Sequence, residues 1–107
     1  MHKSSRHWGR LVLLLTSIYY AVSAQAGSDT ATRQMGASCF GCHGTNGNSV
    51  GGTPVLAGMK RDHFIKQMQD FKSGARPATV MHRHAKGYSD VEIEKLADYF
   101  AAQKRAP

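Results

Sequence analysis

The sequence is poor in tryptophan, proline and cysteine, and these shortages limit what can hold the chain together. Among 107 residues there are one Trp, at position 8, three Pro and two Cys. Because only two residues separate Cys39 from Cys42, a bridge between them would close a very short loop and remove little entropy from the unfolded chain. A disulfide scaffold therefore explains this pair poorly, and a chemical role explains it better.

Dense runs of Lys or Arg are also missing, although the formal net charge is +7. The basic residues are interleaved with Asp and Glu, a pattern typical of a solvated surface. A nucleic-acid-binding protein usually gathers its basic residues into a patch or stripe. We therefore expect no nucleic-acid partner.

One long apolar run occurs, at residues 11–22, and three basic residues precede it. Small residues follow it, so residues 1–26 are expected to be a secretory signal peptide that is cleaved near Ala26. The run is short for a membrane span of about 20 residues, so an uncleaved anchor is the alternative and no span is expected after cleavage. The mature chain, residues 27–107, would be periplasmic. It keeps 11 of the 14 basic residues against 7 acidic ones, a net charge of +4.

The spacing of apolar residues predicts one all-α domain over residues 27–107, with no strand. A short first helix is expected at about 29–40, with Ser28 or Asp29 as its N-cap. A middle helix is expected at 60–73, where apolar residues recur at helical spacing and a glycine follows as a C-terminal stop. These are two of three expected main helices.

The last helix has the clearest start signal. Ser89 and Glu92 form a capping box, in which each side chain satisfies an unpaired amide of the first turn. An apolar stripe at i, i+3, i+4 and i+7 then follows: Ile93, Leu96, Ala97 and Phe100. Between the helices we expect two irregular loops. In the first, at 44–58, only Val55 and Leu56 should turn inward; the second spans 75–88.

The five residues Cys39-Phe40-Gly41-Cys42-His43 form the attachment pattern of a c-type haem. In a helical turn the two thiols reach the two vinyl-derived carbons at one edge of the porphyrin, and His43 projects over the ring toward the iron. The pattern has two other readings. A thioredoxin-like dithiol needs a βαβ sheet around it, and a zinc site needs four ligands that adjacent Cys42 and His43 cannot easily share.

In a haem electron carrier, a methionine usually occupies the sixth coordination position of the iron and raises its reduction potential. The mature chain has four: Met35, Met59, Met68 and Met81. Met68 lies at core spacing, where a methionine is more often filler than ligand. Met81 lies far downstream, before the final helix, where the chain can cross the opposite face of the haem, so we expect Met81 to be the ligand.

His82 and His84 are the alternatives, as sixth ligand or as a separate metal pair. Two histidines at i and i+2 in a loop usually face the solvent. His63, on the polar side of the middle helix, is expected to be a surface residue.

Residues 39–49 and 53–58, together with Met81 before residues 86–90, resemble class I cytochromes c. The stretch 71–100 resembles, within that class, the cytochrome subunit of flavocytochrome c sulfide dehydrogenase, which is related to the cytochrome c4 group. The better-known cytochrome subunits of that enzyme carry two haem domains, whereas this chain has one Cys-x-x-Cys-His motif.

The resemblance implies a class I cytochrome c fold with one covalently bound haem c and with His43 and Met81 as axial ligands. It also implies that the Pro54 carbonyl accepts the Nδ1 proton of His43, and that the first and last helices cross with Gly36 against Tyr99 or Phe100.

For function, the resemblance implies a haem subunit that accepts electrons from the flavin subunit of a sulfide dehydrogenase. The FAD would lie on that partner, in a heterodimer or larger assembly, and this chain would not be catalytic alone. A free monohaem carrier is the alternative. A haem-based ligand-binding or sensor module is the alternative from another class, and it would need an open sixth position.

Overall fold

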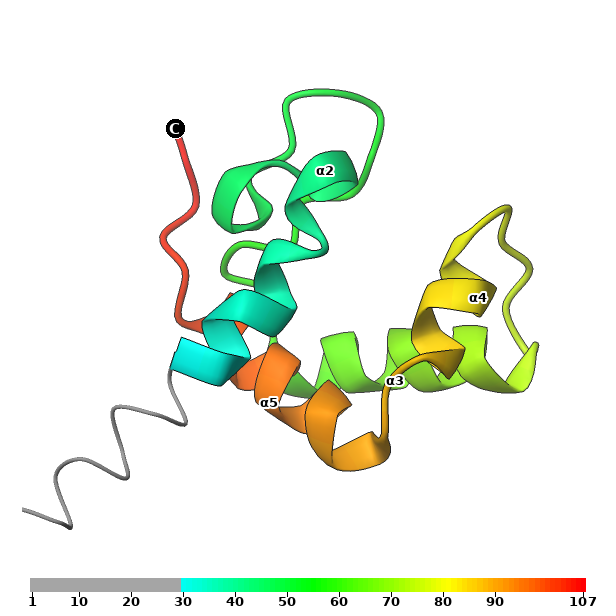
Figure 1. Cartoon of the computed structure of the whole chain (residues 1–107). Coiled ribbons are helices and arrows are strands. Elements are labelled where there is room, and N and C mark those ends of the chain that lie inside the picture. The colour runs from blue at the N-terminus through cyan, green and yellow to red at the C-terminus, as the bar shows by residue number, and fades with distance from the viewer. Residues whose placement is uncertain (1–29) are drawn as a thin grey trace, which may run out of the picture. The chain divides into compact units, whose positions relative to one another are not determined.

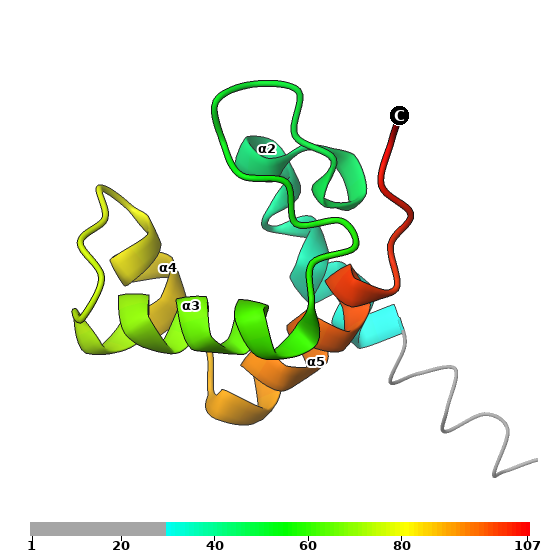
Figure 2. The same ribbon diagram turned by 180° about the vertical axis from the view of Figure 1, so that it is seen from behind.

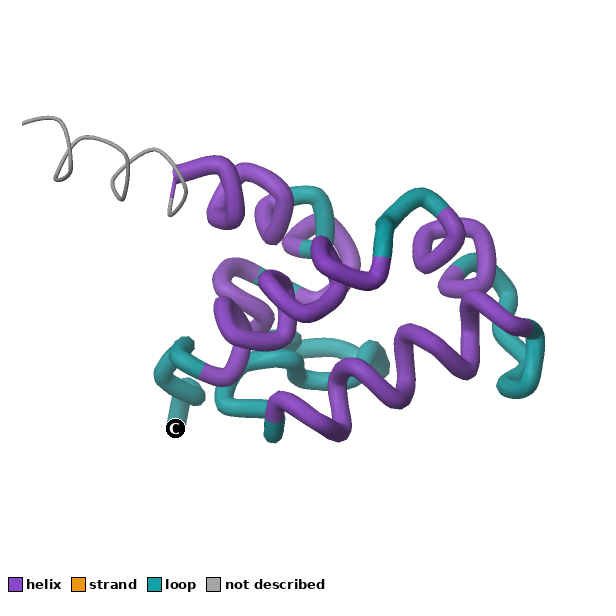
Figure 3. The backbone as a smooth tube through the Cα atoms, turned by 90° about the horizontal axis from the view of Figure 1, so that it is seen from below, coloured by secondary structure: helices purple, strands orange, loops and turns teal. Residues whose placement is uncertain are grey.

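The computed structural model describes residues 30–107, and residues 32–107 form one compact unit. The expected signal peptide and the expected caps of the first helix, Ser28 and Asp29, lie outside the described residues. Within the described part the secondary structure is entirely helical, with connecting loops and no strand (Figure 3). The expected all-α class is confirmed.

The described part of the first helix, residues 30–37, leads through a tight turn into α2, Phe40–His43. A 3-10 turn, η1, follows at Thr45–Gly47. Gly44, between α2 and η1, has φ 77°, and a Cβ there would collide with the carbonyl oxygen of Asn48. Only glycine fits this close return of the chain.

Helix α3 spans Arg61–Ser73, as the sequence predicts to within one residue. It buries Phe64 and Met68 and ends at Gly74, whose φ of 83° is the left-handed conformation common at helix C-termini. Helix α5 spans Asp90–Ala101, and its capping box is present in both directions.

Helix α4, Met81–Lys86, corrects the expectation that 75–88 is an irregular loop. The sequence shows no sustained period here because six residues form less than two turns, and Ala85 is the one residue that the helix buries. No side chain caps its start. Short helices of this kind depend on tertiary packing, and α4 packs against the C-terminal end of α3 (Figures 1 and 2).

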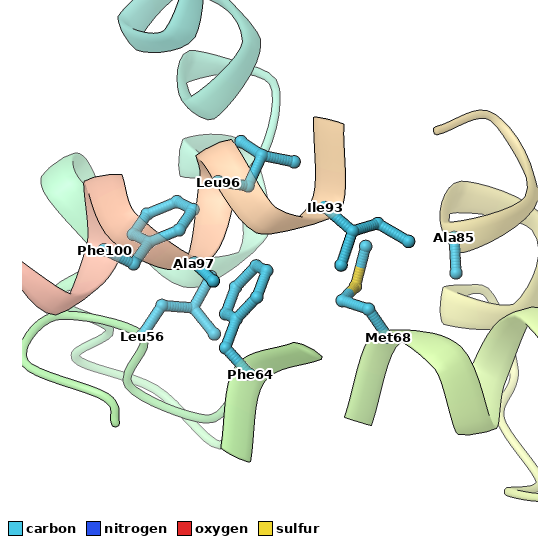
Figure 4. Packing of buried hydrophobic residues seen from close by; sticks show 8 residues of the cluster. All are labelled: Leu56, Phe64, Met68, Ala85, Ile93, Leu96, Ala97 and Phe100. Atoms are coloured by element: carbon cyan, nitrogen blue, oxygen red, sulfur yellow. The ribbon is translucent and has the colours of Figure 1, made fainter. Parts of the chain in front are cut away.

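The core lies where α3, α4 and α5 meet (Figure 4). Phe64 and Phe100 stack with ring centroids 5.6 Å apart, and Met68 lies between Ile93 and Ala85. The four predicted core positions of α5 are all 0% exposed: Ile93, Leu96, Ala97 and Phe100. The predicted apolar stripe of the last helix is therefore confirmed.

The 44–58 loop was predicted to turn Val55 and Leu56 inward, and half of this is right. Leu56 is buried, but Val55 is only half-buried, and Ala57, with 0% exposure, and Gly47 are the other buried residues of the loop. The amides of Leu56 and Ala57 donate to the Gly47 carbonyl at 2.8 and 3.1 Å. These bonds hold this part of the loop against η1.

Gly36 of the first helix lies against Tyr99 of α5. A Cβ at Gly36 would be 2.8 Å from Cε1 of the Tyr99 ring, closer than side-chain atoms normally approach. The Tyr99 ring is held in place by its hydroxyl, which donates to Oδ1 of Asn46 at 3.0 Å, and by an edge contact with Phe100. The close approach that the resemblance implied is confirmed.

Candidate cofactor site

Cys39 and Cys42 lie at the start of α2 and within it, and both thiols are free. Cys39 is half-buried and Cys42 is exposed. Burial raises the pKa of the Cys39 thiol, and the neighbouring Ser38 hydroxyl opposes this rise. The pair is thus presented on one short helix as two unbridged thiols, which suits covalent attachment to a ligand better than a structural bridge.

His43, the last residue of α2, is 8% exposed and has a defined partner. Its ring nitrogen Nδ1 lies 2.7 Å from the carbonyl oxygen of Pro54. A carbonyl only accepts, so Nδ1 carries a proton, and in the neutral imidazole Nε2 then keeps its lone pair. An imidazole oriented in this way is prepared to bind a metal through Nε2.

Among the four methionines, Met68 is a core residue, as expected, with 6% exposure. Met35, Met59 and Met81 are each half-buried and pack against the edge of the core. Met81 is the first residue of α4 rather than the middle of a loop. A helical position gives its thioether a more restricted direction than a loop would.

The histidines beside Met81 differ from each other. His84 is exposed, as is His63 on α3, in agreement with the expectation for surface residues. His82 is half-buried, and its Nδ1 atom is buried without a hydrogen-bond partner. The expectation that both loop histidines face the solvent is therefore wrong for His82, because α4 turns part of its ring inward.

The two other readings of the cysteine motif find no support in residues 30–107. No group of three or more His, Cys, Asp or Glu side chains in this part of the chain can hold a metal ion, as a zinc site would require. The sheet of a thioredoxin-like dithiol protein is missing from the same residues. The thiols and His43 instead fit a covalently bound haem, which would supply reversible one-electron chemistry when attached.

Sequence reasoning missed a polar connection beside this site. The Tyr88 hydroxyl lies 2.7 Å from the Ser38 hydroxyl, and Nζ of Lys72 donates to the Tyr88 carbonyl at 2.8 Å. Ser38 and Tyr88 are 50 residues apart. Neither carries a sequence signal for this contact, because a serine before a motif and a tyrosine after a glycine occur in many surface turns.

An all-helical domain that presents two free thiols and the adjacent buried imidazole on one helix defines a c-type cytochrome domain. The chain belongs to the cytochrome c family: residues 27–104 match the family model for cytochrome c. Covalently bound haem c and electron transfer are the properties of this family.

Several curated relatives are similar to the chain. It is 49% identical to the cytochrome subunit of sulfide dehydrogenase from Chlorobaculum tepidum over 59% of this chain and 57% of that protein. It is 38% identical to cytochrome c4 from Pseudomonas aeruginosa, over 88% of this chain and 48% of that protein. It is 35% identical to the thiosulfate dehydrogenase electron acceptor of Thiomonas intermedia, over 87% of this chain and 42% of that protein. The chain therefore spans about half the length of these relatives.

Within residues 30–107, no helix is both long enough and apolar enough to cross a bilayer.

Proposed function

We propose that this chain is the electron-transfer subunit of a periplasmic flavocytochrome c sulfide dehydrogenase and carries one haem c. Cys39 and Cys42 hold the haem through thioether bonds, and His43 and Met81 bind its iron. The observation that carries the haem assignment is the buried imidazole of His43, oriented by Pro54 beside two free thiols. The 49% identity to the cytochrome subunit of a sulfide dehydrogenase supports the partner.

In this proposal each ligand has a separate task. The hydrogen bond to Pro54 fixes the ring of His43 and increases the basicity of Nε2. Met81, a soft thioether, favours the ferrous state and keeps the potential high enough to accept an electron from a reduced flavin. FAD belongs to the partner subunit, where the sulfur chemistry takes place.

The docking surface is proposed around the thioether edge of the haem. Phe40 lies between the two cysteines and is half-buried, as are Val55 and Met81, and Val50 on the neighbouring loop is fully exposed. Burial of apolar surface contributes roughly 25 cal/mol per Å² before the costs of association are subtracted. A charge at the centre of this surface should therefore weaken docking.

The proposal is tested by isolating the protein from its native periplasm. A sulfide dehydrogenase subunit should copurify with a flavoprotein, keep one haem per chain after denaturation, and begin near Gly27. Haem that is extracted by acidified solvent would contradict covalent attachment, and isolation without any flavoprotein would contradict a dedicated subunit.

The variant Phe40→Glu tests the docking surface in the same complex. We expect it to lose stable association while keeping its haem spectrum. Val91→Glu is the matched control, because Val91 is 63% exposed on α5 and a new carboxylate near the start of a helix is tolerated there. Equal binding by the two variants would place the docking surface elsewhere.

A free soluble carrier is the second candidate, since the match to cytochrome c4 covers 88% of this chain and the match to the sulfide dehydrogenase subunit covers 59%. In that case exposed bases on α4 such as Arg83 and Lys86 steer transient encounters. Electron transfer would then depend strongly on the salt concentration, whereas electron transfer within a stably docked complex would not.

A haem-based sensor would bind carbon monoxide or imidazole readily, and ligation of the iron by Met81 opposes such binding.

A further inference from the structure

The Tyr88 hydroxyl makes a hydrogen bond whose direction can be assigned. Oγ of Ser38 lies 2.7 Å from the Met35 carbonyl oxygen and 2.7 Å from the Tyr88 hydroxyl. A serine hydroxyl has one proton, and the Met35 carbonyl can only accept it. Tyr88 is therefore the donor to Ser38.

The backbone of Tyr88 is held at the C-terminal end of α4. Its amide donates to the carbonyl of Ala85 at 3.3 Å, and Ala85 is completely buried in the core. Its carbonyl accepts from Nζ of Lys72 on α3 at 2.8 Å, and the same Nζ lies 3.0 Å from Oδ1 of Asp90. The phenol thus extends from a fixed point toward the first helix.

The other end of the bond lies beside the cysteine motif. Oγ of Ser38 is 3.9 Å from Sγ of Cys39. Among the labelled elements, α4 packs against α3, and α2 packs against η1, but α2 and α4 do not pack closely on each other. The Tyr88–Ser38 bond connects the loop from α4 to α5 with the segment that joins the first helix to α2.

We propose that Tyr88 is a positioning residue: it keeps α4, and with it Met81, at a fixed position relative to the haem attached through Cys39. This inference rests on the proposed ligation by Met81. Tyr88 lies seven positions after Met81, and α4 fills most of that interval, so a shift of Tyr88 away from Ser38 moves the start of α4 relative to the attachment site. Loss of the bond then makes dissociation of the Met81 sulfur from the iron easier.

The test is cyanide binding to the ferric holoprotein, because cyanide must displace Met81 to reach the iron. Loss of one neutral hydrogen bond should raise the apparent cyanide affinity of Tyr88→Phe by about three- to tenfold. Ser38→Ala removes the acceptor of the same bond and should raise the apparent cyanide affinity by a similar factor. This variant replaces Tyr88→Phe in the test if Tyr88→Phe yields too little holoprotein. The double variant should show no more than the larger single effect, since both remove the same bond.

Tyr99→Phe is the matched control. It also removes one tyrosine hydroxyl bond, to Asn46, but that bond connects α5 to η1 and does not involve α4. We expect its cyanide affinity to stay within about twofold of the wild type, as distant sites act independently.

Three results would overturn the proposal. Unchanged cyanide affinity in both Tyr88→Phe and Ser38→Ala would contradict the positioning role. An increase in the cyanide affinity of Tyr99→Phe equal to that of Tyr88→Phe would also contradict it, because it would indicate that loss of any such bond loosens the whole fold. If the ferric wild type lacks the long-wavelength charge-transfer band of methionine-ligated haem c, then the proposed ligation itself fails. The band therefore separates failure of the ligation from failure of the positioning role.

Discussion

Nδ1 of His43 and the carbonyl oxygen of Pro54 lie 2.7 Å apart, although the two residues are 11 positions apart in the chain. The loop that carries Pro54 is anchored two residues later, where the amides of Leu56 and Ala57 donate to Gly47. The orientation of the imidazole thus depends on a turn that follows it directly in the sequence.

This relationship predicts a protonated Nδ1 in the holoprotein. In the diamagnetic ferrous state, the Nδ1 proton of His43 should be observable by NMR and should exchange slowly with solvent, because it is bonded to a carbonyl and the ring is buried. Pro54→Ala keeps the backbone carbonyl and should preserve the signal. An unprotonated Nδ1 would contradict the assigned orientation.

Ligation by Met81 is tested with alanine variants at two half-buried methionines. Met81→Ala should abolish the long-wavelength charge-transfer band of the ferric protein and lower the reduction potential by on the order of 100 mV, within the ~0.8 V range that axial ligands set. Met59→Ala should leave the band in place. Should the band survive in the first variant and vanish in the second, Met59 would be the ligand.

The contact between Gly36 and Tyr99 predicts a steric cost for any side chain at position 36. Gly36→Ala should lower the free energy of unfolding by about 1–3 kcal/mol, because the Tyr99 ring that its Cβ meets is held by Asn46 and Phe100. A Cβ at Gly51 meets no atom within 4 Å, so Gly51→Ala should stay within about 0.5 kcal/mol of the wild type. Urea unfolding of both variants measures this difference, and equal stabilities would contradict the close contact.

The capping box of α5 predicts a loss of stability in acid. Hydrogen bonds from the Ser89 amide and hydroxyl lower the pKa of Glu92 below its ordinary value of 4.5. A carboxylate with a lowered pKa stabilises the folded state fully above its unfolded pKa and loses this contribution as the pH falls through the folded pKa. Glu92→Gln, which does not titrate, should therefore show a shallower decrease of unfolding free energy below about pH 4.5.

Ser89→Ala removes the other half of the same box. It should cost about 1 kcal/mol at neutral pH, where the wild-type box is complete. Urea unfolding from pH 3 to pH 7 compares the three proteins, and parallel pH profiles for wild type and Glu92→Gln would show that Glu92 does not contribute through its charge.

The residues proposed to attach the haem could be recognised in the sequence because their signals are local. The two cysteines and His43 lie within five residues, so any helical turn brings them together. The same holds for α3 and α5, whose apolar periods continue for about two turns and whose ends carry a glycine stop and a capping box.

Where the sequence was misread, the signal was weak or nonlocal. Helix α4 forms less than two turns and buries only Ala85, so its stability comes from α3 and not from its own residues. The burial of Ala57 instead of Val55 depends on amides that reach back to Gly47.

The sequence by itself determined the helical class, the attachment motif and the family resemblance, since each rests on residues close together in the chain or on a repeated spacing. Only the tertiary structure decided that Met81 begins a helix, that part of the His82 ring turns inward, and that Tyr88 meets Ser38. These features join segments up to 50 residues apart, and such contacts are set by how the helices pack on one another rather than by the preferences of neighbouring residues.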